Sequence, residues 1–424
     1  SYIFTDPKGE LYDRTAGYLK SQGYEIKVLN LVRPQYSDGY NPLMHISSEL
    51  DVDVIANTIV KGQKTDSGSD PYWDDMAEML LKALIYYLIA TRPEEEQNLA
   101  SCAELVRAAN NNGGSNLLTQ LMSQLPYDHP ARMYYKSIEI APDKTYSSIL
   151  SSLQSKLGKF DSKEIAELTS TDTINFEEIG NRKTAVYVIS SDTHTAYDFL
   201  LTIFFSQMIQ QLYDFADQNG GKLKVPTYFI LDEFANIGKI PDFDKKISTS
   251  RSRKISFSVI LQNIDQLEAV YEKSYETIMG NCDTHVFLGS NSFKTVEYFS
   301  KALGETTIDR DSISINKDKQ NMKTGKSISD QIMARALMTP DELRRLDNDL
   351  CIIFEKGIKP VKANKFYYFK HPMAKEMARL EISHNDIGEI DRGEWRKYNP
   401  YNPYDEDKKE EKAQDLKIES LDDL

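Results

Sequence analysis

Cysteine and histidine are scarce in this sequence. The three cysteines, Cys102, Cys282 and Cys351, lie far apart, and the six histidines form no H-x-x-x-H or H-E-x-x-H pattern. Such spacing argues against a disulfide framework and against a zinc site, and it is typical of a protein in a reducing compartment. The sequence therefore offers no cluster of metal ligands, and a metal ion is expected only together with a nucleotide.

Long hydrophobic runs are also lacking. The most apolar stretch, residues 79–90, is interrupted by Lys82, whereas spanning a bilayer takes about 20 apolar residues. The first ten residues have neither the basic flank nor the apolar run of a signal peptide. We therefore expect residues 79–90 to form a buried helix and the sequence as given to be soluble.

Positive charge is in deficit, because the chain has a net charge of −14. Part of the excess acid lies in residues 401–424, whose composition predicts a disordered acidic tail. Basic residues gather locally in the second half of the chain, at Lys245, Lys246, Arg251, Arg253 and Lys254. Because local charge matters more than the sum for nucleic-acid contact, we predict DNA contacts at Lys245, Lys246, Arg253 and Lys254.

The pattern of apolar segments predicts an α/β fold with a mostly parallel sheet. The opening residues read as a short buried strand ending in a turn, and a helix at 11–21 separates them from the next strand. Further strands are expected at 25–29, 184–190, 225–231, 255–261 and 284–288. Helices are expected at 196–215 and up to Thr249, a mobile loop at 309–329, and a closing β pair at 350–354 and 366–370.

Between these strands lies a stretch with only helical patterns. Helices are expected at 74–91, where Asp74 and Asp75 can cap the start, and at 101–110, 116–125 and 147–159. The sequence therefore predicts an all-α domain inserted into the sheet domain. The expected division is a first part of the sheet domain at 1–72, the helical insertion at 73–170, the second part at 171–395 and the tail at 396–424.

The strongest local motif is T-Y-F-I-L-D-E-F at 227–234. An apolar strand ending in Asp-Glu has the form of a Walker B site in nucleotide-hydrolysing motors. Asp232 would hold Mg²⁺ through water, since Mg²⁺ prefers oxygen ligands. Glu233 would polarise the attacking water, because phosphoryl transfer depends on positioning and charge stabilisation. The alternative is that the two acids only cap the following helix.

Two residues downstream of this motif, Arg251 and Gln262, are spaced like further catalytic residues of nucleotide-hydrolysing motors. Arg251 precedes the strand at 255–261, where it could reach across a subunit boundary as an arginine finger. Gln262 ends that strand, where its amide could sense the γ-phosphate. The alternatives are a solvated basic loop for Arg251 and an ordinary polar strand end for Gln262.

Taken together, several motifs resemble one family. D-P-K-G-E at 6–10, D-P-Y-W at 70–73, D-E-F-A-N-I-G at 232–238 and R-A-L-M-T-P-D-E-L-R-R-L at 335–346 follow the order found in the TraG/TraD-like coupling proteins of type IV secretion, in a form similar to Gram-positive members. The resemblance implies a RecA-like P-loop NTPase motor domain with an inserted all-α domain, and Asp232, Glu233, Arg251 and Gln262 match the family's catalytic positions. Arg253 is the neighbour that could replace Arg251.

The resemblance also implies partners and a location. Such proteins form homo-hexamers at the cytoplasmic face of the cell membrane, held there by an N-terminal anchor. They use ATP and Mg²⁺ to move single-stranded DNA, and they bring the relaxase–DNA complex to the secretion channel.

One feature departs from the family. No G-x-x-x-x-G-K-[ST] occurs in the 424 residues, and G-Q-K-T at 62–65 and M-K-T-G-K-S at 322–327 are only fragments of it. In the family this loop precedes the segment that matches D-P-K-G-E, so we expect the sequence to be a fragment that starts after it. Because the loop supplies the backbone N–H groups and the lysine that hold phosphate, we expect negligible ATP hydrolysis by this chain alone.

The D-P-K-G-E turn has two interpretations. Asp6 and Glu10 would lie beside the missing loop and could assist the metal or the water, while Lys8 could contact phosphate or DNA. The alternative is a proline–glycine turn that carries solvated charges.

Two other functions fit parts of the pattern. A chromosome-segregation pump of the FtsK/HerA type would share the motor, but it predicts a C-terminal winged helix and no helical insertion. A non-catalytic adaptor that docks relaxase or secretion proteins would account for the missing loop.

Overall fold

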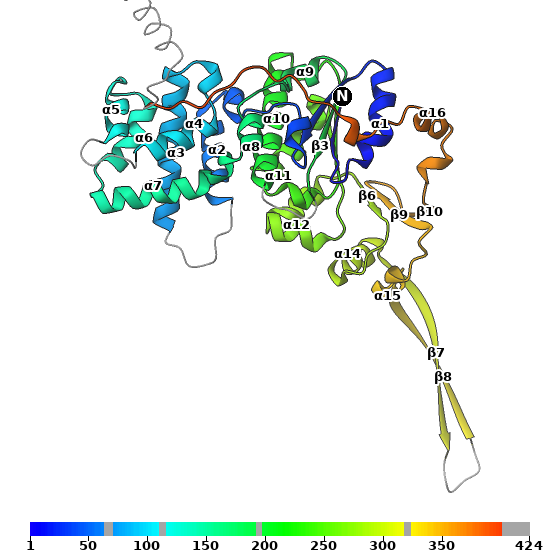
Figure 1. Cartoon of the computed structure of the whole chain (residues 1–424). Coiled ribbons are helices and arrows are strands. Elements are labelled where there is room, and N and C mark those ends of the chain that lie inside the picture. Colours follow the sequence, from blue (N-terminus) through cyan, green and yellow to red (C-terminus); the bar gives the residue numbers. More distant parts are fainter. Residues whose placement is uncertain (63–70, 110–115, 192–196, 318–323, 401–424) are drawn as a thin grey trace, which may run out of the picture.

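The computed structural model of the chain describes residues 1–62, 71–109, 116–191, 197–317 and 324–400. A block of helices lies at one end of the molecule, a five-stranded sheet with its helices lies in the middle, and a small second sheet and a long hairpin lie at the other end (Figure 1). The acidic tail predicted at 401–424 lies outside the described residues. None of the described helices is long and apolar enough to cross a bilayer.

The central sheet is parallel throughout. Its strands are β1 (Tyr2–Thr5), β2 (Glu25–Asn30), β3 (Thr184–Ile189), β4 (Thr227–Leu231) and β5 (Ile255–Val259), in the order β2-β3-β1-β4-β5. The register pairs Thr5 with Val188 on one side and with Leu231 on the other. The strands predicted near the start of the chain and at 25–29, 184–190, 225–231 and 255–261 are thus present in this sheet, whereas the one predicted at 284–288 lies in a second sheet. The carboxyl ends of β1, β3 and β4 meet at one edge.

Helices lie on both faces of this sheet, and they bury its central strand β3 completely, which agrees with the continuous apolar sequence of that strand. On one face, α1 (Glu10–Ser21) packs on alternate residues of β3, Ala185, Tyr187 and Ile189. Val186 and Val188 point to the other face, into the large core that includes α10. That face carries α9 (Phe176–Asn181), α10 (Asp198–Gln218) and α11 (Phe243–Thr249). The helix predicted to reach Thr249 is divided, because a 3-10 turn at Phe234–Ile237 precedes α11.

The predicted all-α stretch is helical, with more helices than the sequence patterns indicated. The block contains α2 (Glu49–Lys61), α3 (Pro71–Thr91), α4 (Leu99–Ala109), α5 (Leu117–Ser123), α6 (Pro130–Glu139), α7 (Asp143–Leu157) and α8 (Lys163–Leu168). The prediction that Asp74 and Asp75 begin a helix was wrong, since α3 already starts at Pro71, as proline at a first helical turn allows. One buried core runs without a break from this block into the sheet.

A second sheet is antiparallel and separate from the first. It consists of β6 (Thr284–Phe287), β9 (Leu350–Glu355) and β10 (Val361–Asn364), in the order β10-β9-β6. It follows α12 (Ile264–Tyr271) and α13 (Ser274–Gly280), and α14 (Phe293–Leu303) and α15 (Pro340–Arg344) cover one of its faces. The prediction of a strand at 366–370 was wrong. The partner of β9 is β10, and residues 368–370 form a 3-10 turn whose aromatic run lies at the surface.

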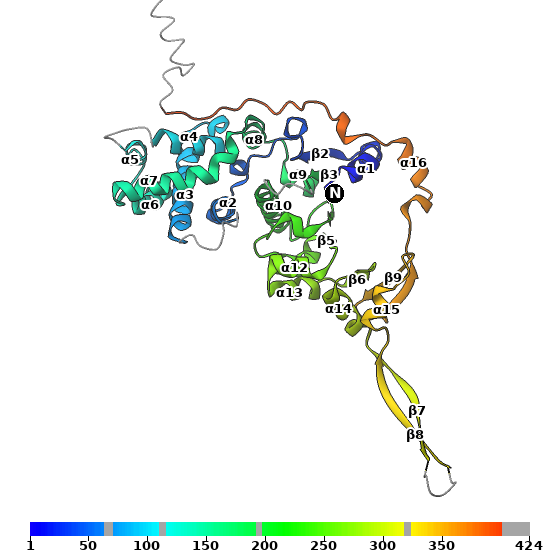
Figure 2. The same ribbon diagram turned by 60° about the horizontal axis from the view of Figure 1, so that its bottom comes forward.

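The long hairpin corrects another expectation. Residues 309–329 were predicted as a mobile loop, but β7 (Glu305–Lys317) and β8 (Thr324–Ala336) pair antiparallel along their whole length (Figure 2). The polarity of the segment hid the period-2 alternation in I-S-I at 313–315 and S-I-S at 327–329, which is typical of strands.

Beyond the second sheet the chain returns to the helical block. Helix α16 (Ala374–Arg379) packs beside α1, and residues 380–400, which we name the strap, then run across the molecule to α4 (Figure 2). At its start, the backbone N–H of Ile382 donates to the carbonyl of Asp13. At its end, the carbonyl of Arg396 accepts from the side chain of the fully buried Asn98 at 3.0 Å. The strap therefore joins the sheet region to the helical block.

Candidate active site

The acidic residues of the two central strands meet at the carboxyl edge of the parallel sheet. The Thr5 hydroxyl at the end of β1 donates to the carbonyl of Asp232 at 2.7 Å, which ties the ends of β1 and β4 together. The backbone N–H of Asp6 donates to the carbonyl of Val188 on β3. Asp6 and Asp232 thus follow neighbouring strands, and in open α/β sheets such a carboxyl edge is where ligands bind.

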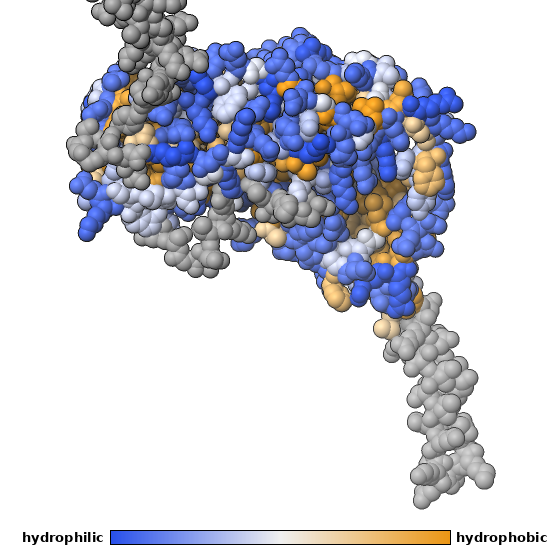
Figure 3. Space-filling model, viewed as in Figure 1, coloured by the Kyte–Doolittle hydropathy of each residue, from blue (hydrophilic) through white to orange (hydrophobic). Residues whose placement is uncertain are grey.

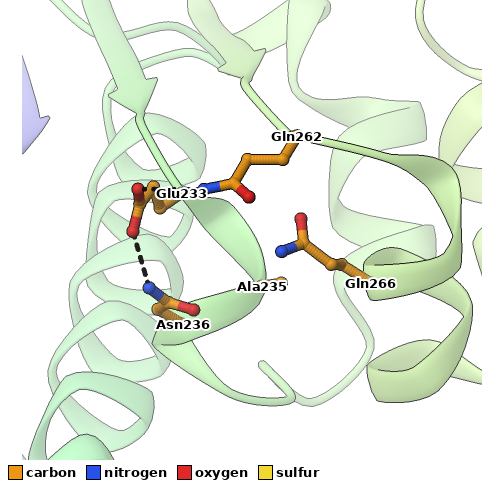
Figure 4. Close-up of a pocket in the computed structure, with 5 residues that line it drawn as sticks. All are labelled: Glu233, Ala235, Asn236, Gln262 and Gln266. Carbon is orange, nitrogen blue, oxygen red and sulfur yellow. Dashed lines mark hydrogen bonds between the residues drawn. The ribbon is translucent and has the colours of Figure 1, made fainter. Parts of the chain in front are cut away.

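Glu233 has an unusual backbone conformation. Its φ of 49° lies in the left-handed region, which is uncommon for a residue with a side chain. The carboxylate of Glu233 is half-buried. It accepts hydrogen bonds from the Asn236 amide at 2.8 Å and from the Gln262 amide at 3.4 Å (Figure 4). Asp232 caps the same turn, since its carboxylate accepts the N–H of Glu233 at 3.1 Å. Glu233 and Gln262 are therefore brought together from two strand ends.

These two residues line a cavity of about 280 Å³ together with Ala235, Asn236 and Gln266. In Figure 4 the Gln266 amide points from the first turn of α12 toward Glu233 and Gln262. Asn236 and Gln266 were not among the residues predicted from the sequence. The available signal was their spacing, since Asn236 is three residues after Glu233 and Gln266 is four residues after Gln262, where one helical turn returns a side chain to the same side.

The D-P-K-G-E turn contributes one buried carboxylate. Asp6 is buried, its carboxylate accepts the N–H of Tyr12 at 2.7 Å, and burial raises the pKa of this carboxyl above its ordinary value. Lys8 and Glu10 are exposed. Gly9 has a φ of 73° and lies against the ring of His384, where a Cβ would approach to 2.5 Å. The turn is thus a packed element of the edge, and only Asp6 is enclosed in it.

Arg251 lies at the other end of the sheet. It begins a short turn before β5, and the neighbouring carbonyl of Lys254 accepts the N–H of Thr227 at the start of β4. A five-residue strand is about 17 Å long, so Arg251 and Glu233 of one chain do not share a pocket. Arg251 is exposed and forms no ion pair within the described ranges.

Two of the four basic residues predicted to contact DNA are paired with carboxylates. Lys245 pairs with Asp242 at 2.6 Å, and Arg253 binds both carboxylate oxygens of Asp217 at 3.0 and 2.9 Å. Burial lowers the pKa of Lys246, and Lys254 is exposed. The geometry thus leaves Arg251 and Lys254 as the accessible, unpaired cations of this cluster.

The donor set suits a hydrated magnesium ion better than a metal held by protein alone. Within the parts of the chain that the structure describes, no three His, Cys, Asp or Glu side chains are grouped as metal ligands. Mg²⁺ usually keeps several waters and takes one or two carboxylates besides phosphate oxygens. Asp232 and Asp6 fit that requirement.

The parallel sheet with helices on both faces, the all-α block and the acidic carboxyl edge define a RecA-like P-loop NTPase fold with an all-α domain. Solved structures of the bacterial conjugative coupling protein TrwB have this architecture. The form in complex with sulphate has a TM-score of 0.58 and 15% identity, and the match covers 88% of this chain and 87% of that one. The form in complex with a non-hydrolysable ATP analogue has a TM-score of 0.59, again at 15% identity and with the same coverage.

The sequence identifies the family. Residues 1–388 match the sequence model of the family described as type IV secretory system conjugative DNA transfer, and the chain belongs to that family. It is 24% identical to the conjugal transfer protein TraG of Escherichia coli, with 90% of this chain and 64% of that protein covered. It is also 24% identical to protein VirD4 of Rhizobium rhizogenes, with 90% and 56% covered. The chain thus spans less than two thirds of the length of these relatives.

Proposed function

We propose that this chain is the motor part of a coupling protein that uses ATP hydrolysis to move DNA during conjugation. The observation that carries the proposal is the meeting of Asp6, Asp232, Glu233 and Gln262 at one edge of a parallel sheet. A TrwB structure has been determined with ADP and Mg²⁺, and the same ligands suit the carboxylate and amide groups of this edge.

Each residue of the edge has a distinct role in this proposal. Glu233 polarises the attacking water, and the two amides that hold its carboxylate fix its direction. Asp232 positions a Mg²⁺ ion through water, with Asp6 as a second carboxylate nearby. Gln262 responds to the γ-phosphate, because its amide can exchange its bond to Glu233 for a phosphate oxygen. Electrostatic positioning of this kind supplies most of the catalysis in phosphoryl transfer.

Arg251 serves a neighbouring subunit in this proposal. Its place at the amino edge excludes it from the pocket of its own chain, and its exposed guanidinium has no acidic partner among the described residues. In a ring of identical subunits, the amino edge of one subunit can face the carboxyl edge of the next. A homo-hexamer around a DNA channel would bring Arg251 to that boundary, where an arginine stabilises the charge of the transition state.

The wider role follows from the family. We propose that the protein acts at the cytoplasmic face of the membrane, binds the single-stranded transfer strand and the relaxase, and passes them to the type IV secretion channel. The helical block and the strap offer surfaces for these partners at a distance from the pocket.

The proposal is tested by comparing ATP hydrolysis by two chains, the 424-residue chain and one extended at its amino end. For the 424-residue chain, we expect negligible magnesium-dependent phosphate release, because the glycine-rich loop that holds phosphate does not occur in it. In a chain extended at its amino end by the family's strand and loop, we expect ATP turnover, and Glu233→Gln should lower kcat by about 10²–10⁴-fold with little change in ATP binding.

The control is Glu297→Gln, which removes an exposed carboxylate on α14 and should leave kcat unchanged. Turnover that survives Glu233→Gln would contradict the proposed role of Glu233. Clear turnover by the 424-residue chain would contradict the expected dependence on the loop.

A further inference from the structure

A second cationic region lies outside the cluster at 245–254. Residues 356–375 contain six lysines, at 356, 359, 362, 365, 370 and 375, and no acidic residue. We name this stretch the lysine–aromatic segment. Its absence of acids is unusual in a chain of net charge −14. A run of lysines is by itself most often a solvated face, so its surroundings decide whether it has a role.

The lysines of the segment are accessible and unpaired. Five of the six are exposed, Lys365 is half-buried, and none of them forms an ion pair with any residue in the described ranges. By contrast, Lys245 and Arg253 of the other cluster are bound to carboxylates. The lysines of the segment are therefore not bound to carboxylates, which leaves their charge available to an anionic partner.

Aromatic rings stand between these lysines. The sequence K-F-Y-Y-F-K at 365–370 exposes Phe366 to 72%, Tyr368 to 56% and Phe369 to 61%. Large aromatic side chains normally bury most of their surface, yet three within four residues lie open here. Hydrophobic surface is visible along this part of the chain, between β9 and α16 (Figure 3).

The rings are held in place by the backbone around them. The N–H of Lys365 donates to the carbonyl of Asp349 at 2.7 Å, and the Tyr367 hydroxyl donates to the Asp349 carboxylate at 2.5 Å. Arg14 of α1 lies over the ring of Tyr368 at 5.1 Å from its centroid. The segment is therefore ordered before any ligand arrives, which lowers the entropic cost of binding.

We propose that the lysine–aromatic segment is a binding site for single-stranded nucleic acid. Proteins that bind single strands combine cations along the phosphate backbone with exposed rings on which bases stack, and residues 356–375 supply both. Here the phosphates contact the lysines, while bases stack on Phe366, Tyr368 and Phe369. The inference rests on the proposed function, because it names where a motor of conjugative DNA transfer holds its strand.

The lysine–aromatic segment contacts the helix that begins at the carboxyl edge of the parallel sheet. Arg14, which touches Tyr368, lies one helical turn beyond Glu10 at the end of the D-P-K-G-E turn. A strand bound on the rings therefore lies close to the helix that starts at the carboxyl edge of the sheet. Cations also lie over two of the rings, with Arg14 over Tyr368 and Lys370 over Tyr367.

The experiment is fluorescence anisotropy of a labelled oligothymidylate titrated with the whole chain and its variants. Phe366→Ala combined with Phe369→Ala should weaken binding by at least about fivefold for each ring that stacks on a base. Lys359→Gln, Lys362→Gln and Lys370→Gln together should reduce the slope of log K against log salt by about 2. A duplex of the same length should bind more weakly, since its bases are not free to stack.

The matched control changes exposed, unpaired lysines elsewhere, Lys222→Gln, Lys273→Gln and Lys301→Gln, and alters net charge by the same amount. It should leave binding within about twofold of the native chain. If the native chain binds the oligonucleotide and the ring variant binds equally well, the inference is wrong and the proposed function stands. If the native chain binds no nucleic acid at all, both fail.

Two further outcomes would also overturn the inference. If the ring variant loses binding to vesicles of anionic phosphatidylserine but keeps oligonucleotide binding, the segment is a membrane contact. If it changes only the oligomeric state in light scattering, the segment is an interface between copies of the chain.

Discussion

The parallel sheet and the antiparallel sheet are covered to very different extents. All six residues of β3 in the parallel sheet are buried. In the antiparallel sheet, α14 and α15 pack on one face. On its other face Val286 and Val361 are each 50% exposed. The centre of the first sheet is enclosed like the interior of a domain, while the second sheet presents a surface.

This difference in burial suits the two sheets to different roles. A sheet buried on both faces is a rigid support, and loops at its carboxyl edge keep fixed positions. Asp232, Glu233 and Asp6 are placed in this way. A sheet with one open face and an exposed cationic extension can instead contact another molecule. In the functions proposed above, the parallel sheet carries the chemistry and the region of the antiparallel sheet contacts the nucleic acid.

The largest expected effect is a loss of stability from a substitution in the parallel sheet. Phe229 of β4 is fully buried, and its ring stacks on Phe257 at 4.8 Å between centroids. Phe229→Ala should lower the free energy of unfolding by about 3–5 kcal/mol, because it removes buried surface and leaves a cavity. Guanidinium-induced unfolding followed by circular dichroism measures the change.

Val361→Ala on β10 is the counterpart in the open sheet, and it should stay within about 0.5 kcal/mol of the native chain. Comparable losses in the two variants would break the comparison, since they would mean that the outer face of the antiparallel sheet is covered in solution.

The strap gives the next largest effect, because it joins the region of the parallel sheet to the helical block. Gly17 of α1 lies against the strap's first residue, and a Cβ there would come within 1.9 Å of the carbonyl of Leu380. Gly17→Ala should displace the strap at a cost of about 1–3 kcal/mol, partly offset by about 1 kcal/mol from the better helix propensity of alanine. Limited proteolysis with mass spectrometry should show faster cleavage within residues 380–400.

Gly158→Ala provides the control, since a Cβ at Gly158 meets nothing within 4 Å and its φ of −56° suits alanine. Equal cleavage in both variants would show that the strap does not depend on its contact with α1.

The sequence predicted the enclosed sheet far better than the open one, for a physical reason. A strand buried on both faces, such as Val186–Ile189, is a continuous apolar run that can be recognised locally, and the apolar run Tyr228–Leu231 was recognised in the same way. The carboxylates at 232 and 233 follow from the end of such a strand. The pairing of β6 with β9 joins residues more than 60 positions apart, and no local pattern specifies it.

Other errors have local causes. The apolar run at 366–370 resembles a strand by composition, but its rings are at the surface, so hydrophobicity there does not report burial. Asn236 and Gln266 were missed because their spacing alone does not distinguish them from other uncharged amides, and only the folded turn at Glu233 brings them to one cavity. The roles of Arg251 and Gln262, and the domain limits, stay predictions.

The smallest effect concerns pH and the buried carboxyl at the parallel sheet's edge. Burial raises the pKa of Asp6 in the folded chain. The folded state then holds the proton more tightly than the unfolded state. The resulting stability is fully present below the ordinary pKa of aspartate and is lost as pH rises through the raised pKa. At neutral pH the buried charge therefore lowers stability.

Asp6→Asn removes this charge and should raise the melting temperature at neutral pH, with a gain that disappears in acid. The amide oxygen of asparagine can still accept the N–H of Tyr12, which the carboxylate accepts in the native chain. Glu355→Gln, at an exposed position on β9, should reproduce the native pH curve. A variant at Asp6 that is less stable at every pH would mean that the charged hydrogen bond to Tyr12 outweighs the cost of burial. A gain would instead show that the edge retains a carboxylate that weakens the fold, as functional sites often do.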